Sequence, residues 1–294
     1  MIDIQSNIPL APLTSYKIGG PARHYLSASL LSDIVAGLAW AHEHGETVLM
    51  LGRGSNLLVS DSGFAGLVID TSATSAISWD RTTAHVAGGT ALHDLVRAAV
   101  DRGMGGMEEL CGIPGTVGGG IIMNAGAFSQ TISDCVVAVE VVERDGTNRR
   151  MIEKKDIEFS YRNSSIKADG SIILSATFSF IEGDLAKLTA TFDDIQNRRR
   201  EKQPLDLPSC GSVFKRPPGG YAGTLIESCG LKGFTIGGAQ VSEKHTNFIV
   251  NIGSATANDV RSLIVHIQKT VLDQTGTILA PEVIFIGEFG VDIL

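Results

Sequence analysis

Glycine-rich loops are the feature that most limits what this chain can fold into and bind. The 34 glycines gather mainly in three loops, at residues 52–56 (GRGSN), 112–120 (GIPGTVGGG) and 237–238. Glycine lets backbone N–H groups turn inward and form an anion-binding concavity, which would suit a diphosphate. Tight turns between short strands would use glycine in the same way, so no single loop decides between these interpretations. The sequence has neither the Rossmann GxGxxG arrangement nor the P-loop GxxxxGK[ST], so a different phosphate-binding solution is expected.

Length and composition describe an ordinary globular protein. The 294 residues suggest two domains, or one large domain with an inserted part. With 43% hydrophobic and 19% charged residues, the chain is neither disordered nor a coiled coil. Its formal charge of -8 makes nucleic acid an improbable partner. We expect a cytoplasmic protein with reduced cysteines, because no signal peptide, membrane span or CxxC pair is found.

The pattern of apolar residues predicts an α+β fold. Helices are expected at residues 30–44, after a Ser29 cap and before Gly45, and at 90–102, 184–202 and 257–275, the last between a Thr256/Asp259 capping box and Gly276. Strands are expected at 47–51 and 67–70, with a hairpin of 136–142 and 148–152 around Asp145-Gly146. Prolines at 204 and 208 predict a domain boundary near residues 203–209.

Three polar residues stand in unusual surroundings. Arg162 lies between aromatic residues in FSYRNS and could grip a carboxylate, although a surface salt bridge would explain it equally well. Ser212 precedes apolar Val213 and Phe214, which suggests either a specific hydrogen bond or a turn serine. Glu282 enters the apolar run VIFI, where it needs a partner unless it sits at a strand end.

The basic run at residues 198–202 has two interpretations. It would usually be a solvated helix face, but its position just before the glycine-containing tail would also let it reach a phosphorylated ligand. The histidines show no metal-binding spacing, since His42 and His44 fall on different faces of one predicted helix. No metal site is therefore expected.

Taken in order, the motifs resemble the UDP-N-acetylenolpyruvoylglucosamine reductase family, whose members use FAD to make the UDP-N-acetylmuramate precursor of peptidoglycan. The matching segments are TSYKIGGPA (14–22), LGRGSNLLVSDSGFAGLVI (51–69), GIPGTVGGGIIMNAGA (112–127), FSYRNS (159–164), CGSVFKRP (210–217), AGTLIESCGLKGFTIGGAQVSEKHTNFIVN (222–251) and PEVIFIG (281–287). Each motif alone is weak evidence, whereas the ordered set covers nearly the whole chain and is highly specific.

The resemblance implies an FAD-binding part of the vanillyl-alcohol-oxidase type in two lobes, at residues 1–70 and 71–203. A smaller C-terminal α+β domain at 204–294 would bind the substrate, and its last strand could return to the first lobe. The glycine loops would hold the FAD diphosphate through main-chain N–H groups. The cofactor-binding residues implied are Gly52, Arg53, Gly54, Ser55, Asn56, Leu57, Gly112, Pro114, Gly115, Thr116, Gly118, Gly119 and Asn124.

The resemblance also implies the reaction. NADPH would reduce the flavin and leave, and UDP-N-acetylglucosamine enolpyruvate would then accept a hydride at its β carbon. Arg162 and Glu282 match the residues that stabilise the enol-like intermediate, and Ser212 matches the donor of a proton to the α carbon. The substrate-binding residues implied are Arg198, Lys202, Lys215, Arg216 and Tyr221, the last in place of a capping tyrosine that compact members lack. The protein is expected to act as a monomer.

Some positions depart from the family pattern. Gly120 stands where alanine is usual, and Phe128 and Ser129 stand where tyrosine and glycine commonly follow NAGA, which bears on flavin packing. Two other functions remain open at this point: a flavin-dependent oxidase with the same fold, and a nucleotide-sugar-binding protein without turnover. Bleaching of the flavin by an alcohol would indicate the oxidase, and a colourless protein that binds the sugar nucleotide would indicate the binding protein.

Overall fold

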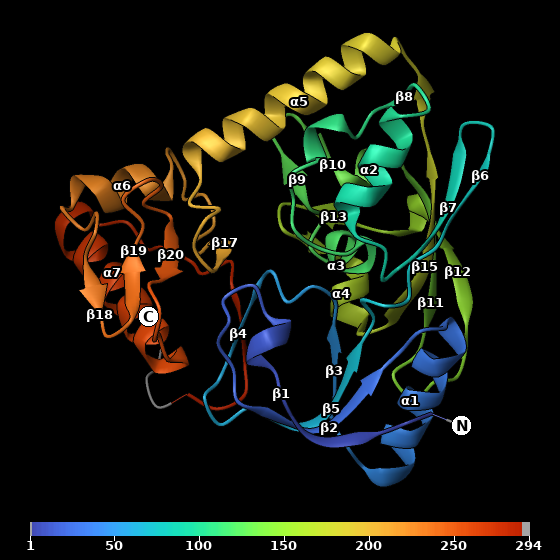
Figure 1. The fold of residues 1–294 in the computed structure, drawn as a ribbon, viewed down its shortest axis with the longest axis horizontal. Coiled ribbons are helices and arrows are strands. Elements are labelled where there is room, and N and C mark those ends of the chain that lie inside the picture. The colour runs from blue at the N-terminus through green and yellow to red at the C-terminus, as the bar shows by residue number, and fades with distance from the viewer. Residues whose placement is uncertain (1, 290–294) are drawn as a thin grey trace. The chain divides into compact units, whose positions relative to one another are not determined.

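The computed structural model describes residues 2–289 and divides the chain into two compact units (Figure 1). Unit 1 comprises residues 1–6, 24–53 and 66–198, and unit 2 comprises 7–23, 54–65 and 199–294. Residue 1 and residues 290–294, which end the predicted parts 1–70 and 204–294, lie outside the described residues. The division into parts 1–70, 71–203 and 204–294 stays a prediction.

The first layer of unit 1 places helix α1 (Leu31–His44) on a sheet. The sheet order is β1 (Gln5–Pro9), β2 (Pro21–Ser27), β5 (Phe64–Asp70) and β3 (Val48–Leu51), and the division between the units falls within β1, β2 and β5. β3 and β5 run parallel, with Val48 opposite Leu67. The apolar face of α1, including Ile34 and Leu38, packs on Leu26, Leu67 and Ile69. This core fixes where β3 ends and the first glycine loop begins.

The predicted Ser29 cap of α1 is wrong, although the helix itself is confirmed. Leu30 is the N-cap, and the carboxylate of Asp33 accepts the backbone N–H groups of Ser29 and Leu30 at 3.0 and 2.9 Å. A first-turn carboxylate therefore does the capping from inside the helix. Gly45 ends the helix at φ 67°, as predicted.

The second layer of unit 1 is a five-stranded antiparallel sheet, clear in Figure 1. Its order is β12 (Arg150–Glu153), β11 (Val136–Val142), β15 (Ile172–Ser179), β7 (Thr83–Ala87) and β6 (Ile77–Asp80). Helices α2 (Leu92–Val100), α3 (Val117–Ile122) and α5 (Leu185–Lys202) contribute to its core through Leu95, Ile121 and Phe192. The predicted helix at residues 90–102 is thus confirmed but shorter.

Short elements complete this unit. They are β8 (Met104–Gly105) paired with β16 (Ile181–Glu182), β9 (Gly126–Ala127) paired with β10 (Gln130–Thr131), β13 (Phe159–Ser160) paired with β14 (Asn163–Ser164), helix α4 (Ser165–Asp169), and the 3-10 turns η2 (Glu108–Leu110), η3 (Ile132–Asp134) and η4 (Lys154–Asp156).

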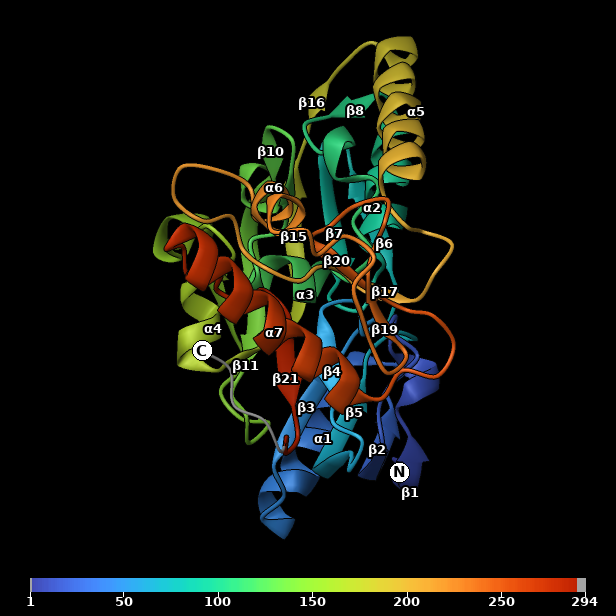
Figure 2. The same ribbon diagram turned by 90° about the vertical axis from the view of Figure 1, so that its left-hand side faces the viewer.

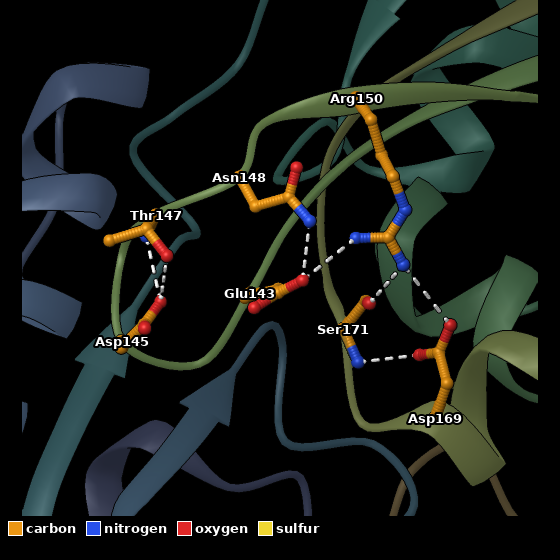
Figure 3. A network of polar contacts seen from close by, with 7 residues as sticks. All are labelled: Glu143, Asp145, Thr147, Asn148, Arg150, Asp169 and Ser171. Carbon is orange, nitrogen blue, oxygen red and sulfur yellow. Dashed lines mark hydrogen bonds and ion pairs between the residues drawn. The ribbon is translucent and has the colours of Figure 1, made fainter.

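The predicted hairpin of β11 and β12 is confirmed. Asp145 accepts the Thr147 N–H at 2.8 Å and its hydroxyl at 2.7 Å, which lowers the pKa of Asp145, while Gly146 takes φ 83° (Figure 3). Arg150 then approaches the carboxylates of both Glu143 and Asp169 at 3.6 Å. The turn and the start of β15 are therefore tied together by side chains on either side of Arg150.

Unit 2 carries a four-stranded antiparallel sheet covered by helix α7 (Ala257–Thr275), visible in Figure 2. The strand order is β17 (Ser209–Ser212), β20 (Phe248–Asn251), β19 (Ala239–Val241) and β18 (Thr235–Ile236). The unit also contains helix α6 (Ala222–Ser228), the turn η1 (Ala11–Leu13), and the parallel pair β4 (Leu57–Val59) and β21 (Ile284–Ile286). Leu263 and Ile267 of α7 form the core with Val213, Val241 and Ile249.

The third glycine cluster serves packing against α7. A Cβ at Gly237 would lie 2.3 Å from the Asp259 side chain, and one at Gly238 would lie 2.3 Å from the Ala255 nitrogen. The Gly238 N–H already donates to Asp259 at 3.2 Å. These glycines allow close approach of a turn to the helix start, so the anion-binding interpretation of this pair is wrong. The capping box of Thr256 and Asp259 and the Gly276 stop are confirmed.

Candidate active site

The GRGSN loop follows β3 and approaches the second glycine loop. A Cβ at Gly52 would lie 2.6 Å from Thr116 Oγ1, so only glycine allows this contact within unit 1. At Gly54, φ is 58°, and its carbonyl oxygen accepts the N–H and hydroxyl of Ser15. Within residues 2–289, no hydrogen bond uses the backbone N–H of Arg53, Ser55 or Asn56. The loop therefore offers main-chain donors to a ligand.

The GIPGTVGGG loop is held by a third glycine segment that the sequence analysis missed, at residues 88–90. Gly118 N–H donates to the Gly88 oxygen at 2.8 Å, and Val117 N–H donates to the Thr90 oxygen at 2.8 Å. Thr116 caps the short helix α3 by accepting the Gly119 N–H at 3.3 Å. The double glycine directly after β7 was the signal that could have found this segment.

Asn124 stands at the end of the second loop in a left-handed conformation, with φ 41°. Its Nδ2 donates to the Ser160 oxygen at 3.1 Å, whereas its Oδ1 is buried and accepts no hydrogen bond from the described residues. A buried acceptor without a donor costs on the order of 1–3 kcal/mol. A bound group that donates here would remove that cost.

Arg162 lies near Asn124 in the same unit. Its Nη1 donates to the Gly126 oxygen at 3.2 Å, and its guanidinium stacks 5.1 Å from the Tyr161 ring centre. Its φ of 56° is rare for a non-glycine residue and costs about 1–3 kcal/mol, a kind of strain that gathers at functional sites. The predicted aromatic neighbourhood of Arg162 is confirmed for Tyr161.

Ser212 and Glu282 meet through the backbone in unit 2. Ser212 ends β17, and the next residue, Val213, accepts the Glu282 N–H at 2.7 Å through its carbonyl oxygen. An isolated bridge between Phe214 and Pro281 extends the pairing. Both side chains are half-buried. Residues 70 positions apart in the chain thus occupy neighbouring extended segments, while Arg162 belongs to unit 1.

Asn56 connects the first glycine loop to Glu282. Its Nδ2 donates to the Glu282 oxygen at 3.2 Å, and its own oxygen accepts the Ile284 N–H at 3.0 Å. Leu57 begins β4 and stands opposite Ile284 in the parallel pair. Nearby, burial raises the pKa of the Cys210 thiol to about 12, and the Glu282 carboxylate acts in the same direction.

The predicted substrate-binding cations are mostly exposed. In unit 1, Arg198 pairs with Asp194 at 3.5 Å and stacks 4.6 Å from the Phe128 ring centre. In unit 2, Arg216 stacks 4.6 Å from the ring of Tyr221, which is 62% exposed. Lys202 is exposed at the end of α5, and the Lys215 N–H donates to the Ala280 oxygen. An aromatic partner thus accompanies each of the two arginines.

Metal ligation and membrane insertion find no support in the described part of the chain. Among residues 2–289, no three His, Cys, Asp or Glu side chains gather closely enough to hold a metal ion. None of the helices formed by those residues is both long and apolar enough to cross a membrane. All four cysteines are free.

Known proteins share this sequence over almost its full length. A reductase from Exiguobacterium sibiricum, named UDP-N-acetylenolpyruvoylglucosamine reductase, is 44% identical over 282 residues, or 96% of this chain and 92% of that protein. The chain belongs to the UDP-N-acetylenolpyruvoylglucosamine reductase family. A relative of the same name from Caldicellulosiruptor saccharolyticus is 42% identical and covers 98% of this chain and 93% of its own.

Domain models and a solved structure agree with this family. The model "UDP-N-acetylenolpyruvoylglucosamine reductase, C-terminal domain" matches residues 203–286, and the model "FAD binding domain" matches residues 22–151. The crystal structure of the Thermus caldophilus reductase superimposes with a TM-score of 0.82 at 30% identity, covering 98% of this chain and 100% of that one. The predicted α+β fold, with an FAD-binding domain and a C-terminal family domain, is confirmed.

The residues of the family's FAD-binding region fit the group they would hold. The loops that contain Gly52 and Gly118 approach closely around Thr116 and Gly88, as main-chain binding of a diphosphate requires. Backbone donors in the GRGSN loop and the buried acceptor of Asn124 are the polar groups left for a ligand. The donor set is therefore suited to an anion with a polar ring system attached.

Proposed function

We propose that this protein is the NADPH-dependent, FAD-containing reductase that converts UDP-N-acetylglucosamine enolpyruvate to UDP-N-acetylmuramate for peptidoglycan synthesis. Family membership supports the reaction class. The observation that carries the proposal is the hydrogen bond from Glu282 N–H to the Val213 oxygen, because it sets a hydroxyl and a carboxylate on adjacent segments. The relatives' printed names supply the substrate and product class.

FAD would be bound by the two glycine loops. We assign its diphosphate to main-chain groups of residues 52–57 and of the 112–119 loop, and a donor of its ring system to Asn124 Oδ1. When bound, FAD supplies the centre that takes a hydride from NADPH and passes it to carbon. Thr116 keeps the second loop in place by capping, so its hydroxyl acts on loop geometry.

Ser212 is assigned the proton transfer. Hydride addition to the β carbon of the enolpyruvyl double bond leaves an electron pair at the α carbon, conjugated with the carboxylate. The Ser212 hydroxyl gives its proton to that carbon, forming the second C–H bond, and solvent restores the hydroxyl. A serine is a weak acid, so this step depends on the strong basicity of the enolate carbon and on a cation such as Lys215 or Arg216 that eases proton loss.

Arg162 and Glu282 are assigned to charge stabilisation. The guanidinium would form a charge-assisted pair with the substrate carboxylate, where negative charge grows during the reaction. Its bond to the Gly126 oxygen and its stack on Tyr161 fix its direction beforehand. Glu282 would bind the enol-like form of the intermediate. Arg198, Lys202, Lys215, Arg216 and Tyr221 are proposed to contact the sugar nucleotide, and the enzyme is proposed to act as a cytoplasmic monomer.

A product analysis tests this function. Purified protein loaded with FAD should oxidise NADPH only when UDP-N-acetylglucosamine enolpyruvate is present. The nucleotide recovered should be heavier by two hydrogen atoms, one from NADPH at the β carbon and one from solvent at the α carbon. In deuterated water the α position alone should carry deuterium. NADPH oxidation without a change in the sugar nucleotide would refute the proposal.

A further inference from the structure

The strand that delivers Ser212 is irregular just before this residue. In the pairing of β17 with β20, Ser209 stands opposite Val250 and Ser212 opposite Phe248, so three steps on one strand match two on the other. Gly211 within this bulge takes φ 80° and has no atom within 4 Å of where a Cβ would be. A bulge redirects the side chains that follow it. The direction of Ser212 therefore depends on what holds the chain after the bulge.

Asn247 holds that segment with three hydrogen bonds. Its side-chain Oδ1 accepts the Phe214 N–H at 3.1 Å, its Nδ2 donates to the Phe214 oxygen at 2.9 Å, and its carbonyl oxygen accepts the Val213 N–H at 2.8 Å. The residue is 9% exposed. One amide thus satisfies both backbone groups of Phe214 in a buried place, where losing either bond would be costly.

The same segment carries Glu282. The Val213 carbonyl oxygen, whose own N–H is bonded to Asn247, accepts the Glu282 N–H. Asn247 is itself fixed, because its N–H donates to His245 Nδ1 at 3.3 Å and the adjacent Thr246 hydroxyl donates to the Gly223 oxygen at 2.7 Å. A chain of bonds therefore runs from helix α6 through this turn to both residues assigned to the chemistry.

We propose that Asn247 is a positioning residue for the reduction, which aims the Ser212 hydroxyl and places Glu282 without touching the substrate. This inference rests on the proposed function. It predicts that an Asn247 variant is impaired in the half-reaction that uses the proton and charge stabilisation, and not in the reduction of the flavin by NADPH. A purely structural role would weaken both half-reactions together.

The test compares Asn247→Ala with Asn251→Ala in FAD-loaded protein. Asn251 is a matched control, because it is also buried and bonds only backbone groups, those of Tyr16, Gly253 and Ala255. Stopped-flow mixing of the NADPH-reduced enzyme with UDP-N-acetylglucosamine enolpyruvate should be slowed about 10- to 100-fold in Asn247→Ala, the scale of a roughly 1 Å misplacement. Flavin reduction by NADPH should stay within about twofold of wild type, because the assigned proton donor takes no part in it.

Two further measurements separate positioning from general damage. Added to Ser212→Ala, which has lost its proton donor, Asn247→Ala should cause a smaller further loss than it causes alone, as expected for coupled residues. Amide hydrogen exchange should be faster at Val213 and Phe214 in the variant without FAD. If Asn247→Ala is too unstable to purify, Asn247→Asp, which keeps an acceptor for the Phe214 N–H, is expected to show a smaller but selective loss.

The inference is overturned if Asn247 variants slow both half-reactions equally, if Asn251→Ala slows the second half-reaction as much, or if the effects of Ser212→Ala and Asn247→Ala are additive. Failure of the proposed function would look different, because wild-type protein would then not convert the sugar nucleotide at all. The deuterium content at the α carbon in wild type keeps the two failures apart.

Discussion

Asn56 donates a hydrogen bond from Nδ2 to the main-chain oxygen of Glu282 across 3.2 Å, although 226 residues separate them in the chain. The return bond from Ile284 N–H to the Asn56 oxygen closes a two-way link in unit 2. A loop assigned to the cofactor and a carboxylate assigned to the reaction are thereby held by one amide. This link explains why GRGSN needs an asparagine after its glycines.

Asn56→Ala is therefore expected to lower FAD affinity and turnover together. Loss of one partly buried hydrogen bond costs about 0.5–1.5 kcal/mol, or up to roughly tenfold in affinity. Reconstitution of the apoprotein with FAD, followed by steady-state kinetics, measures both. The exposed Asn258 contributes its backbone N–H to Asp61, so Asn258→Ala is a control expected to change neither quantity. A change in turnover without any change in FAD affinity would contradict the link.

Replacing Asn124 tests the buried acceptor. Asn124→Gly keeps the φ of 41° accessible while removing the amide, so it separates side-chain loss from backbone strain. FAD affinity should fall about tenfold, and Asn124→Ala should fall further because alanine adds strain. Flavin retained after gel filtration provides the measurement. Full retention in Asn124→Gly would mean that Oδ1 has no role toward the cofactor.

Ser212→Ala should separate the two half-reactions. NADPH should still bleach the flavin at about the wild-type rate, since the assigned proton donor takes no part in that step. Turnover of the enolpyruvyl substrate should be lost, because the α carbon lacks its proton source. Rapid-mixing kinetics of each half-reaction measure this. A steady-state rate near wild type would remove Ser212 from the mechanism.

Arg162→Ala and Glu282→Gln should each lower turnover about 100-fold or more, the scale for removing one group that stabilises developing charge. The backbone bonds of Glu282 remain in Glu282→Gln, so its fold should be kept. The KM and kcat of both variants should be compared with those of Arg149→Ala, which alters an exposed arginine paired with Glu140. Unchanged kinetics in both variants would place the chemistry elsewhere.

Alkaline pH should destabilise the protein through Cys210. Its pKa is raised by burial to about 12, above the roughly 8.5 of an unfolded cysteine. The stabilisation from keeping the thiol neutral is complete below pH ~8.5 and is lost as the pH rises towards 12. Urea unfolding between pH 8 and pH 11 should show a declining free energy of unfolding, with a smaller slope in Cys210→Ala. Cys229→Ala should keep the wild-type slope, and an equal slope in all three proteins would refute this origin.

Local sequence signals predicted the elements whose stops and turns are local. Asp145-Gly146 fixed a hairpin and Gly276 a helix end, because each conformation is decided within a few residues. Ser29 misled, since Asp33 supplied the same acceptor from within the helix. The glycines at 237 and 238 misled for a different reason: their requirement comes from Asp259, about 20 residues away, and not from a ligand.

The parts of the candidate site that escaped prediction depend on long-range partners. Ser212, Arg162 and Glu282 drew attention as polar groups in apolar or aromatic surroundings. Asn247 did not, because its importance lies in bonds to Phe214, 33 residues away. Gly88 likewise gains its role only when Gly118 packs against it. Chemistry-bearing residues can thus be read from residue type and motif, whereas their supports are defined by tertiary contacts.

An anaerobic spectral titration tests the central claim most directly. The yellow protein, purified with FAD, should be bleached by one equivalent of NADPH and remain bleached after NADP is removed. Addition of UDP-N-acetylglucosamine enolpyruvate without oxygen should then restore the oxidised flavin spectrum and yield UDP-N-acetylmuramate in equal amount. A bleached flavin that stays colourless with this substrate, or a protein that binds no flavin, would contradict the account.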